Sequence, residues 1–195
     1  MPKTNGSGQA ATLTNEQLEA LLEAAPSPEQ RFLWAVMRYT GSRVTETLRL
    51  TWGAIHNDRI AFVASTTKTR TTREPRIAPR LQGEVERYRK HWEQRHGRAS
   101  RPRDLVFPGR YGLGEPMTRQ AADLALRQTT ERLGLPRGIS LHSFRRSLAT
   151  TMVQRGASLR TVQEFTGHAR LDQLQRYVDV SPSDIEAAWA AIGAM

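Results

Sequence analysis

Cysteine is absent from this 195-residue chain, and its absence excludes several kinds of chemistry. The protein cannot form disulfides, bind a metal through thiolates or use a cysteine nucleophile. No apolar run approaches the roughly 20 residues that a membrane-spanning helix needs. The first residues, MPKTNGSGQAAT, contain no apolar segment of the kind that a secretory signal carries. These absences predict a cytoplasmic protein that does not enter a membrane.

Lysine is rare as well. Lys3, Lys68 and Lys90 are the lysines among 29 basic residues, so arginine supplies nearly all of the positive charge. With 19 acidic residues, the net charge at pH 7 is +10. A protein of this charge attracts polyanions, nucleic acid above all, and arginine forks pair with phosphate through two hydrogen bonds. A basic ribosome-associated protein or a GC-rich genome would give a similar composition, so charge alone leaves the partner open.

Several motifs of metal and nucleotide chemistry are also missing. The sequence has no HExxH pair, no clustered acidic triad and no loop of the EF-hand type. It lacks the GxxxxGK[ST] pattern of a P-loop, so a reaction driven by ATP has no support. We therefore expect neither a metal nor a cofactor.

The pattern of apolar residues predicts a mainly helical domain. Residues 1–12 are small and polar and are expected to form a flexible arm, which leaves 13–195 as one domain. Capping boxes predicted from Thr14 with Gln17, Ser27 with Gln30 and Ser183 with Glu186, together with 3.6-residue periodicity, indicate helices in that domain. They are expected at about 14–25, 27–40, 81–92, 118–133, 141–155, 158–166 and 183–192, with a further short helix leading to Tyr177.

Strand-like residues flank one polar segment. IAFVAS (60–65) precedes TTKTRTTREP, and RIAP follows it, which predicts strands joined by a turn rich in threonine and arginine. The expected fold class is therefore α+β, mainly helical with a small antiparallel sheet. Lys68 lies on the turn, where a lysine is ordinarily just solvated.

Residues 40–52, TGSRVTETLRLTW, place Arg43 three positions before Glu46. Apolar residues in this stretch recur at helical spacing, which puts the arginine and the carboxylate on neighbouring parts of one helix face. The spacing alone favours a surface ion pair, which contributes little to stability. The alternative is an arginine that its carboxylate holds in place for binding.

Residues 141–180 contain a second group of polar side chains. His142 and Arg145 are three apart and can face one pocket, His168 follows a helix-ending glycine, and Tyr177 lies among apolar neighbours. Taken singly, these residues are most simply a packed pair, a helix end and a half-buried aromatic. Together they supply what cleavage of a phosphodiester without metal requires: a nucleophile, cations around the non-bridging oxygens and proton donors.

The ordered set of motifs resembles the catalytic domain of the tyrosine recombinases, the phage integrase family. TGSRVTETLRLTW is similar to the first-arginine motif, TTKT to the hairpin that bears the lysine, LHSFRRSLAT to the H-x-x-R box and FTGH to the L-G-H signature. A tyrosine follows FTGH at the spacing expected of the nucleophile. The resemblance implies that Glu46 supports the first arginine and that the catalytic residues are Arg43, Lys68, His142, Arg145, His168 and the nucleophile Tyr177.

The resemblance also implies an activity and partners. We expect a site-specific recombinase or integrase that cuts and rejoins double-stranded DNA through a covalent 3′-phosphotyrosyl intermediate, acting as a homo-oligomer, a tetramer, on DNA. Further contacts to DNA are expected from Arg70, Arg73, Arg146 and Arg170. Two other functions stay open: a nicking and closing enzyme like the type IB topoisomerases, and a non-catalytic DNA-binding regulator or remnant of the family.

The chain departs from the family pattern in two places. Phe165 and Thr166 stand where aliphatic residues are commoner, and Leu174 replaces a small hydroxyl residue, although neither change removes a catalytic group. Most members have a core-binding domain before the catalytic domain, whereas about twelve residues precede it here. We expect a short form, like the fimbrial-switch invertases, or a fragment of a longer integrase. The helix at about 183–192 could pack on its own domain or dock on a neighbouring protomer.

Overall fold

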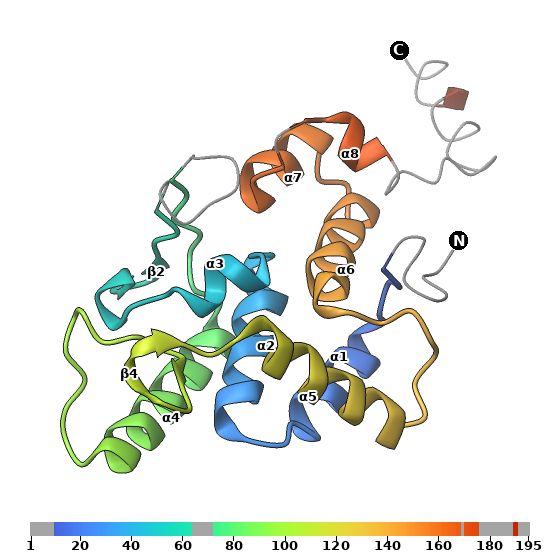
Figure 1. Ribbon diagram of the computed structural model, residues 1–195. Coiled ribbons are helices and arrows are strands. Elements are labelled where there is room, and N and C mark those ends of the chain that lie inside the picture. The colour runs from blue at the N-terminus through green and yellow to red at the C-terminus, as the bar shows by residue number, and fades with distance from the viewer. Residues whose placement is uncertain (1–9, 64–71, 169, 176–188, 191–195) are drawn as a thin grey trace.

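The computed structural model describes residues 10–63, 72–168, 170–175 and 189–190 (Figure 1). In this part of the chain most residues are helical, and the strands form two antiparallel pairs, β1–β2 and β3–β4. The predicted class, mainly α with antiparallel β structure, is confirmed, with two small sheets where one was expected. In chain order the elements are α1 (Asn15–Glu23), α2 (Pro28–Thr40), α3 (Val44–Leu48), η1 (Trp52–Ala54), β1 (Ile55–His56), β2 (Arg59–Ile60), α4 (Pro79–His96), β3 (Pro108–Gly109), β4 (Gly112–Pro116), α5 (Arg119–Arg132), α6 (Leu141–Gln154), α7 (Leu159–Thr166) and α8 (Asp172–Gln175).

Local capping signals explain where several helices begin. Thr14 and Gln17 form the predicted capping box at the start of α1. At α2 the predicted box is only half formed. The Ser27 hydroxyl accepts from the Gln30 N–H at 3.3 Å, but the Gln30 side chain donates to the sulfur of Met117 at 3.2 Å. A partly buried residue far away in the sequence has therefore taken the amide that the local motif would have used.

The main core surrounds α2, which packs against α1, α3, α4 and α6 (Figure 1). Phe32 of α2 is fully buried and stacks on Tyr88 of α4, with ring centroids 4.7 Å apart. Phe107 packs against both rings, 5.6 Å from Phe32 and 5.8 Å from Tyr88 between centroids. The Tyr88 hydroxyl donates to the carbonyl of Val106 at 2.8 Å. Burying aromatic side chains of this size is the main source of stability for such a core.

A second, smaller core lies where α6, α7 and α8 meet. Its buried members are Ala149, Val162 and Leu174, and they form a cluster separate from the main core. Figure 1 shows α7 and α8 at the far end of α6, away from α4 and α5. The segment that carries His168 therefore belongs to a small unit with its own apolar centre.

The helical spacing noted in residues 40–52 corresponds to a helix over only part of this stretch. The helix α3 ends at Leu48, and the 3₁₀ turn η1 follows. The reason is pairing with a distant segment: the Trp52 N–H donates to the Asp104 carbonyl at 3.0 Å, and the Leu50 carbonyl accepts from Val106 at 2.9 Å. Backbone groups bonded in this way are unavailable to a helix.

Of the strand expected at 60–65, the structure describes residues 60–63, which contain the end of β2 and an isolated bridge at Phe62. Ile60 pairs with Ile55 in the β1–β2 sheet, and Phe62 exchanges two backbone hydrogen bonds with Arg73, at 2.9 and 3.1 Å. The first described residues after the gap therefore return antiparallel to the strand that leads into it. Residues 64–71, with Lys68 and Arg70, lie outside the described part of the chain.

The packed part of the chain reaches into the predicted N-terminal arm. Ala10 is buried, and its carbonyl accepts from Arg146 at 2.6 Å. The Ala11 N–H donates to the Gly138 carbonyl at 3.0 Å.

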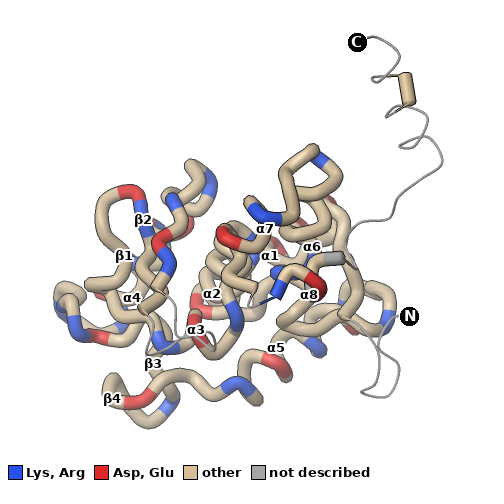
Figure 2. The backbone as a smooth tube through the Cα atoms, turned by 90° about the horizontal axis from the view of Figure 1, so that it is seen from above, with Lys and Arg blue, Asp and Glu red and all other residues tan. Residues whose placement is uncertain are grey.

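Among the described helices, none combines the length and the apolarity needed to cross a membrane. Figure 2 shows the basic positions spread over many elements, with acidic ones between them.

Candidate functional site

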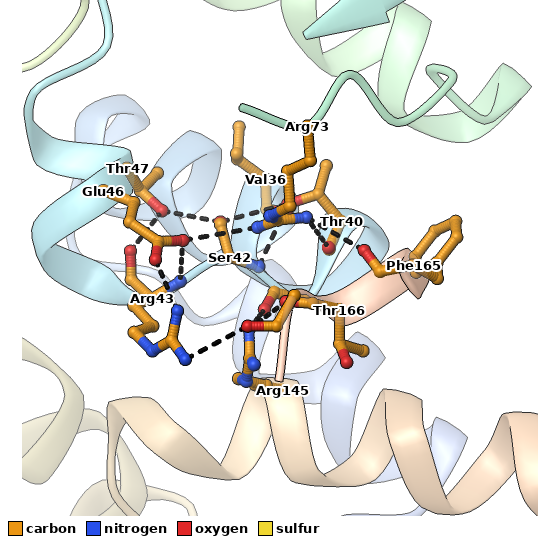
Figure 3. Close-up of polar contacts among 12 residues, drawn as sticks. Val36, Thr40, Ser42, Arg43, Glu46, Thr47, Arg73, Arg145, Phe165 and Thr166 are labelled. Carbon is orange, nitrogen blue, oxygen red and sulfur yellow. Dashed lines mark hydrogen bonds and ion pairs between the residues drawn. The ribbon is translucent and has the colours of Figure 1, made fainter. Parts of the chain in front are cut away.

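In the first predicted pair, Glu46 is buried and Arg43 is partly buried, so the pair is not an exposed surface ion pair (Figure 3). Glu46 is 1% exposed, and its Oε1 accepts from Arg43 Nη1 at 2.7 Å while Oε2 accepts from the Arg43 N–H at 3.1 Å. Burial alone would raise the pKa of Glu46, but hydrogen bonds from the Arg43 side chain and backbone outweigh it and hold the pKa below its usual range. Arg43 also donates to the Gly167 carbonyl at 3.3 Å. Its guanidinium is therefore fixed from two sides.

A chain of buried hydroxyls shapes the loop before α3. Thr40 Oγ1 donates to the Val36 carbonyl at 2.7 Å, and Ser42 Oγ lies 2.7 Å from Thr47 Oγ1. Thr47 in turn donates to the Arg43 carbonyl at 3.0 Å. These bonds satisfy polar groups that burial would otherwise leave unpaired. They hold the backbone of Arg43 in the orientation from which its side chain reaches Glu46.

Arg145 of α6 is 1% exposed and lies between two helix ends. Its Nη1 donates to the Gly41 carbonyl at 2.8 Å, just after α2, and to the Thr166 carbonyl at 2.5 Å, at the end of α7. Its Nε donates to Nε2 of His168 at 3.3 Å. A helix C-terminus carries unsatisfied carbonyls and partial negative charge, so it is a natural partner for a cation.

His168 is 8% exposed and lies against the same arginine. Its Nδ1 lies 2.6 Å from Thr166 Oγ1, and that hydroxyl donates to the Val162 carbonyl at 2.6 Å. Nδ1 therefore carries the imidazole proton, and Nε2 accepts from Arg145. Burial, followed by the charge of Arg145, lowers the pKa of His168 to about 3. The histidine is neutral at pH 7.

Of the other predicted catalytic residues, the structure describes only His142. His142 is exposed on the first turn of α6 and is close enough for its charge to lower the pKa of His168. Lys68 and Tyr177 lie outside the described residues. The structure therefore brings together Arg43, Glu46, Arg145 and His168, and leaves the roles of lysine and tyrosine as predictions.

The arginines predicted to bind DNA differ in exposure. Arg170 is exposed and pairs with Asp172 at 3.0 Å, whereas Arg146 binds the N-terminal segment. Arg73 has a side chain only 10% exposed, and it binds Glu46 Oε2 at 3.3 Å. Its Nη1 donates to the carbonyls of Thr40 at 3.0 Å and Phe165 at 3.1 Å. These internal contacts favour another role for Arg73 than binding DNA.

The arrangement is suited to holding a phosphate. Arg43, Arg145 and His168 come from the start of α3, from α6 and from the segment after α7. Arg145 contacts His168, and Arg43 contacts the carbonyl of the residue before it. Figure 3 shows the two arginines at this place. Fixed donors around one centre stabilise negative charge without reorganising during a reaction. The described residues contain no cluster of three histidine, aspartate or glutamate side chains that could hold a metal ion.

The sequence model of the phage integrase family matches residues 11–184 of this chain. The chain belongs to the phage integrase family. Among curated relatives of this member, the tyrosine recombinase XerD of Pseudomonas putida is 31% identical over 184 residues, which are 90% of this chain and 59% of the relative. XerD of Halalkalibacterium halodurans is 29% identical over 185 residues, 91% of this chain and 60% of the relative. This integrase-family chain thus spans about 60% of the length of the relatives that it matches.

Solved structures give the same fold for this phage integrase family member. A XerH site-specific recombinase bound to its difH substrate aligns with a TM-score of 0.76 at 24% identity, covering 95% of this chain and 55% of that chain. The Tn1549 transposon integrase with a circular intermediate DNA aligns with a TM-score of 0.77 at 17% identity, covering 95% of this chain and 67% of that chain. The fold of the described residues is therefore that of the recombinase catalytic domain.

Sequence reasoning missed the residues that support the site of this family member. Thr40, Ser42 and Thr47 surround Arg43 in the sequence, and their hydroxyls were a signal that the loop is buried and hydrogen-bonded. Thr166, treated as a departure from the pattern, orients His168 through its hydroxyl. The internal role of Arg73 had no local signal, because its partners lie 33 and 92 positions away.

Proposed function

We propose that this chain is the catalytic domain of a site-specific DNA recombinase that cuts and rejoins double-stranded DNA. The observation that carries the proposal is the convergence of Arg43, Arg145 and His168, which are up to 125 positions apart in the sequence, on one site. Relatives called tyrosine recombinases cover nearly all of the chain, and the similar XerH structure contains its difH substrate. This domain would bind a phosphate of duplex DNA at the same place.

The proposed reaction is a transesterification. The hydroxyl oxygen of Tyr177 attacks phosphorus and loses its proton to solvent. A new bond joins tyrosine to the 3′-phosphate, and the bond to the 5′-oxygen breaks. Lys68 gives the leaving oxygen its proton, so a free 5′-hydroxyl forms. Arg43 and Arg145 stabilise the charge on the non-bridging oxygens. The covalent link conserves the phosphodiester bond energy, so a 5′-hydroxyl from a partner site can reverse the step.

The histidines would act around the same phosphate. In the DNA-free protein, Nε2 of His168 accepts from Arg145, so it has no proton to donate. A phosphate can provide the negative charge that favours protonation, after which Nε2 would donate to a non-bridging oxygen. His142, on the first turn of α6, would assist proton transfer or orient the phosphate.

Strand exchange between two sites requires more than one active site. We propose that the protein acts as a homo-tetramer on DNA, with the segment after Tyr177 docking on its own or a neighbouring protomer. Truncation after Val180 tests the docking: single-site cleavage that survives while strand exchange is lost supports docking on the neighbour. The proposed DNA substrate also implies a cytoplasmic location.

The decisive test is formation of the covalent adduct. The chain is incubated with a pool of nicked, end-labelled duplexes of randomised sequence, and DNA that stays bound in detergent is recovered and sequenced. We expect the unaltered chain to form an adduct and Tyr177→Phe to form none, because a phenyl ring has no oxygen with which to attack. Tyr111→Phe is the matched control, because it removes the same hydroxyl oxygen at a different place. Tyr111 lies on the β3–β4 turn and is 89% exposed.

The same experiment separates the other candidate functions. Adduct formation by Tyr177→Phe would contradict the assignment of the nucleophile. Binding of the pool without any adduct would favour a non-catalytic regulator. A separate assay tests the third function: relaxation of a supercoiled plasmid without sequence preference would favour a nicking and closing enzyme.

A further inference from the structure

The end of α7 meets the main body of the protein through polar contacts. The apolar cluster of α6, α7 and α8 is separate from the main core, so apolar packing alone does not fix the segment 165–168 against α2 and α3. Three consecutive carbonyls of this segment accept hydrogen bonds from three arginines that lie far away in the sequence. Phe165 accepts from Arg73, Thr166 from Arg145 and Gly167 from Arg43.

This arrangement follows from the chemistry of helix ends. The last carbonyls of a helix have no partners within the helix and carry partial negative charge. The end of α2 meets the end of α7 here, and the Thr40 and Gly41 carbonyls of that end accept from Arg73 and Arg145. Two negative helix ends would repel each other, and the guanidinium groups between them remove that repulsion.

Arg73 occupies the central place between these elements (Figure 3). Its Nη1 bridges the carbonyls of Thr40 and Phe165, and its Nη2 binds the buried carboxylate of Glu46. Its guanidinium lies over the ring of Phe62, 4.4 Å from the centroid. A side chain placed on Gly167 would approach within 3.2 Å of Cδ of Arg73, so the arginine stem also lies against the glycine before His168.

Through Glu46, Arg73 reaches the first arginine of the site. Glu46 has two carboxylate oxygens: Oε1 holds the guanidinium of Arg43, and Oε2 is shared between the Arg43 backbone and Arg73. Without Arg73, the carboxylate would lose one of its two cationic partners in a buried position, which is costly. Its orientation, and with it the position of the Arg43 guanidinium, would no longer be fixed.

We propose that Arg73 is a positioning residue for the reaction: it docks the end of α7 on α2 and holds Glu46 so that Arg43 points at the phosphate. The inference rests on the proposed function for its catalytic consequence. It replaces the prediction that Arg73 binds DNA directly. A positioning residue should affect the rate of adduct formation when it is replaced, whereas a DNA-binding residue should affect the Kd for the duplex.

The test compares Arg73→Met with the unaltered chain on the nicked duplex that the chain selects from the randomised pool. At saturating DNA we expect the rate of adduct formation to fall about 100-fold, the loss typical of a catalytic group displaced by about 1 Å. The Kd for the duplex should stay within about 3-fold. Arg76→Met is the matched control, because Arg76 makes an isolated bridge three positions after that of Arg73 and has a side chain 76% exposed. The rate of this variant should be unchanged.

A second substrate separates positioning from a general structural defect. A methylphosphonate at the cleaved position removes one negative charge, so the reaction depends less on a well-placed arginine. We expect the rate difference between the unaltered chain and Arg73→Met to shrink at least 10-fold on this substrate. A difference of equal size on both substrates would overturn the proposal, and so would a weaker Kd with an unchanged rate at saturation. Should Arg73→Met fail to fold, Arg73→Lys, which keeps the charge but not the fork, carries the same comparison.

Docking can also be measured without DNA. In Arg73→Met and Arg73→Lys, we expect amide hydrogen exchange in residues 162–168 to quicken at least 10-fold, because the segment loses a tether to the main body. Exchange in Arg76→Met should match that of the unaltered chain. If the unaltered chain forms no adduct with any duplex, the proposed function has failed. If exchange in 162–168 does not change, the role of Arg73 has failed.

Discussion

The neighbours of His168 determine the tautomer, the hydrogen bonds and the pKa of its imidazole. The Thr166 hydroxyl fixes which ring nitrogen carries the proton, and Arg145 occupies the other nitrogen. Burial and the neighbouring cations then lower the pKa of His168 to about 3. The site is thus prepared for a negative charge, because its positive groups already outnumber the single carboxylate of Glu46.

The lowered pKa of His168 predicts a dependence of stability on pH. Between the folded value of about 3 and the unfolded value near 6.5, only the unfolded chain binds the proton. The free energy of unfolding should therefore rise with pH in this window and fall as pH is lowered from 7 to 5, by up to about 1.4 kcal/mol per pH unit. Urea unfolding at pH 7, 6 and 5 measures this change in the free energy of unfolding.

The control for this prediction compares the loss of a histidine side chain at position 168 with its loss at another position. In His168→Asn the dependence on pH should become flatter, whereas His56→Asn, at an exposed position in β1, should follow the unaltered chain. The measurement stays at or above pH 5, because Glu29 and Glu46 also have lowered pKa values and lose their stabilising effect at lower pH. Equal slopes for His168→Asn and the unaltered chain would contradict the prediction.

At the scale of elements, the ends of α2 and α7 decide the geometry of the site. Gly41 ends α2 with φ +61°, in the left-handed region that favours glycine. A Cβ there would lie 3.1 Å from Leu148 Cδ2 and 3.3 Å from Thr166 Cγ2. Its carbonyl also holds Arg145. The glycine thus combines a backbone requirement with a close approach of α6 and α7.

Gly41→Ala is therefore expected to destabilise the protein more than an alanine at an ordinary helix end. Gly97 ends α4 with nearly the same angle, φ +63°, but a Cβ there meets nothing within 4 Å. Gly97→Ala should cost about 1 kcal/mol, from the left-handed backbone alone. Gly41→Ala should cost at least about 1 kcal/mol more, since neighbouring groups must also move. Urea unfolding of both variants measures the difference, and equal losses would contradict it.

The elements also show what the sequence can predict. Helix starts such as Thr14, and glycine ends such as Gly167, depend on contacts within a few residues and were predicted correctly. The break after α3 was not, because it depends on pairing with residues 104–106. The order of the site residues was recognised from their motifs. The burial of Glu46 and the internal contacts of Arg73 were not, since they arise only when distant elements meet.

At the scale of the whole molecule, the net charge of +10 is a weaker guide than it first suggests. Several arginines of the described residues are occupied by acidic partners, as in the pairs of Arg31 with Glu84 and Arg98 with Asp104. Others are buried in the site. Under the proposed function, the exposed arginines that remain would supply the long-range attraction for DNA, whereas Arg43 and Arg145 would act on the bound phosphate.

This division of charge predicts different responses to salt for binding and for cleavage. Binding releases counterions from DNA, so with 6–10 phosphate contacts the Kd should rise about 10³–10⁵-fold between 50 and 200 mM KCl. Buried charges are screened much less, so the rate of adduct formation at saturating DNA should change less than about 3-fold. Fluorescence anisotropy with the selected duplex gives the first quantity, and single-turnover adduct formation gives the second. A cleavage rate that falls as steeply as the affinity would show that the catalytic cations are exposed to solvent, contrary to the 1% exposure of Arg145.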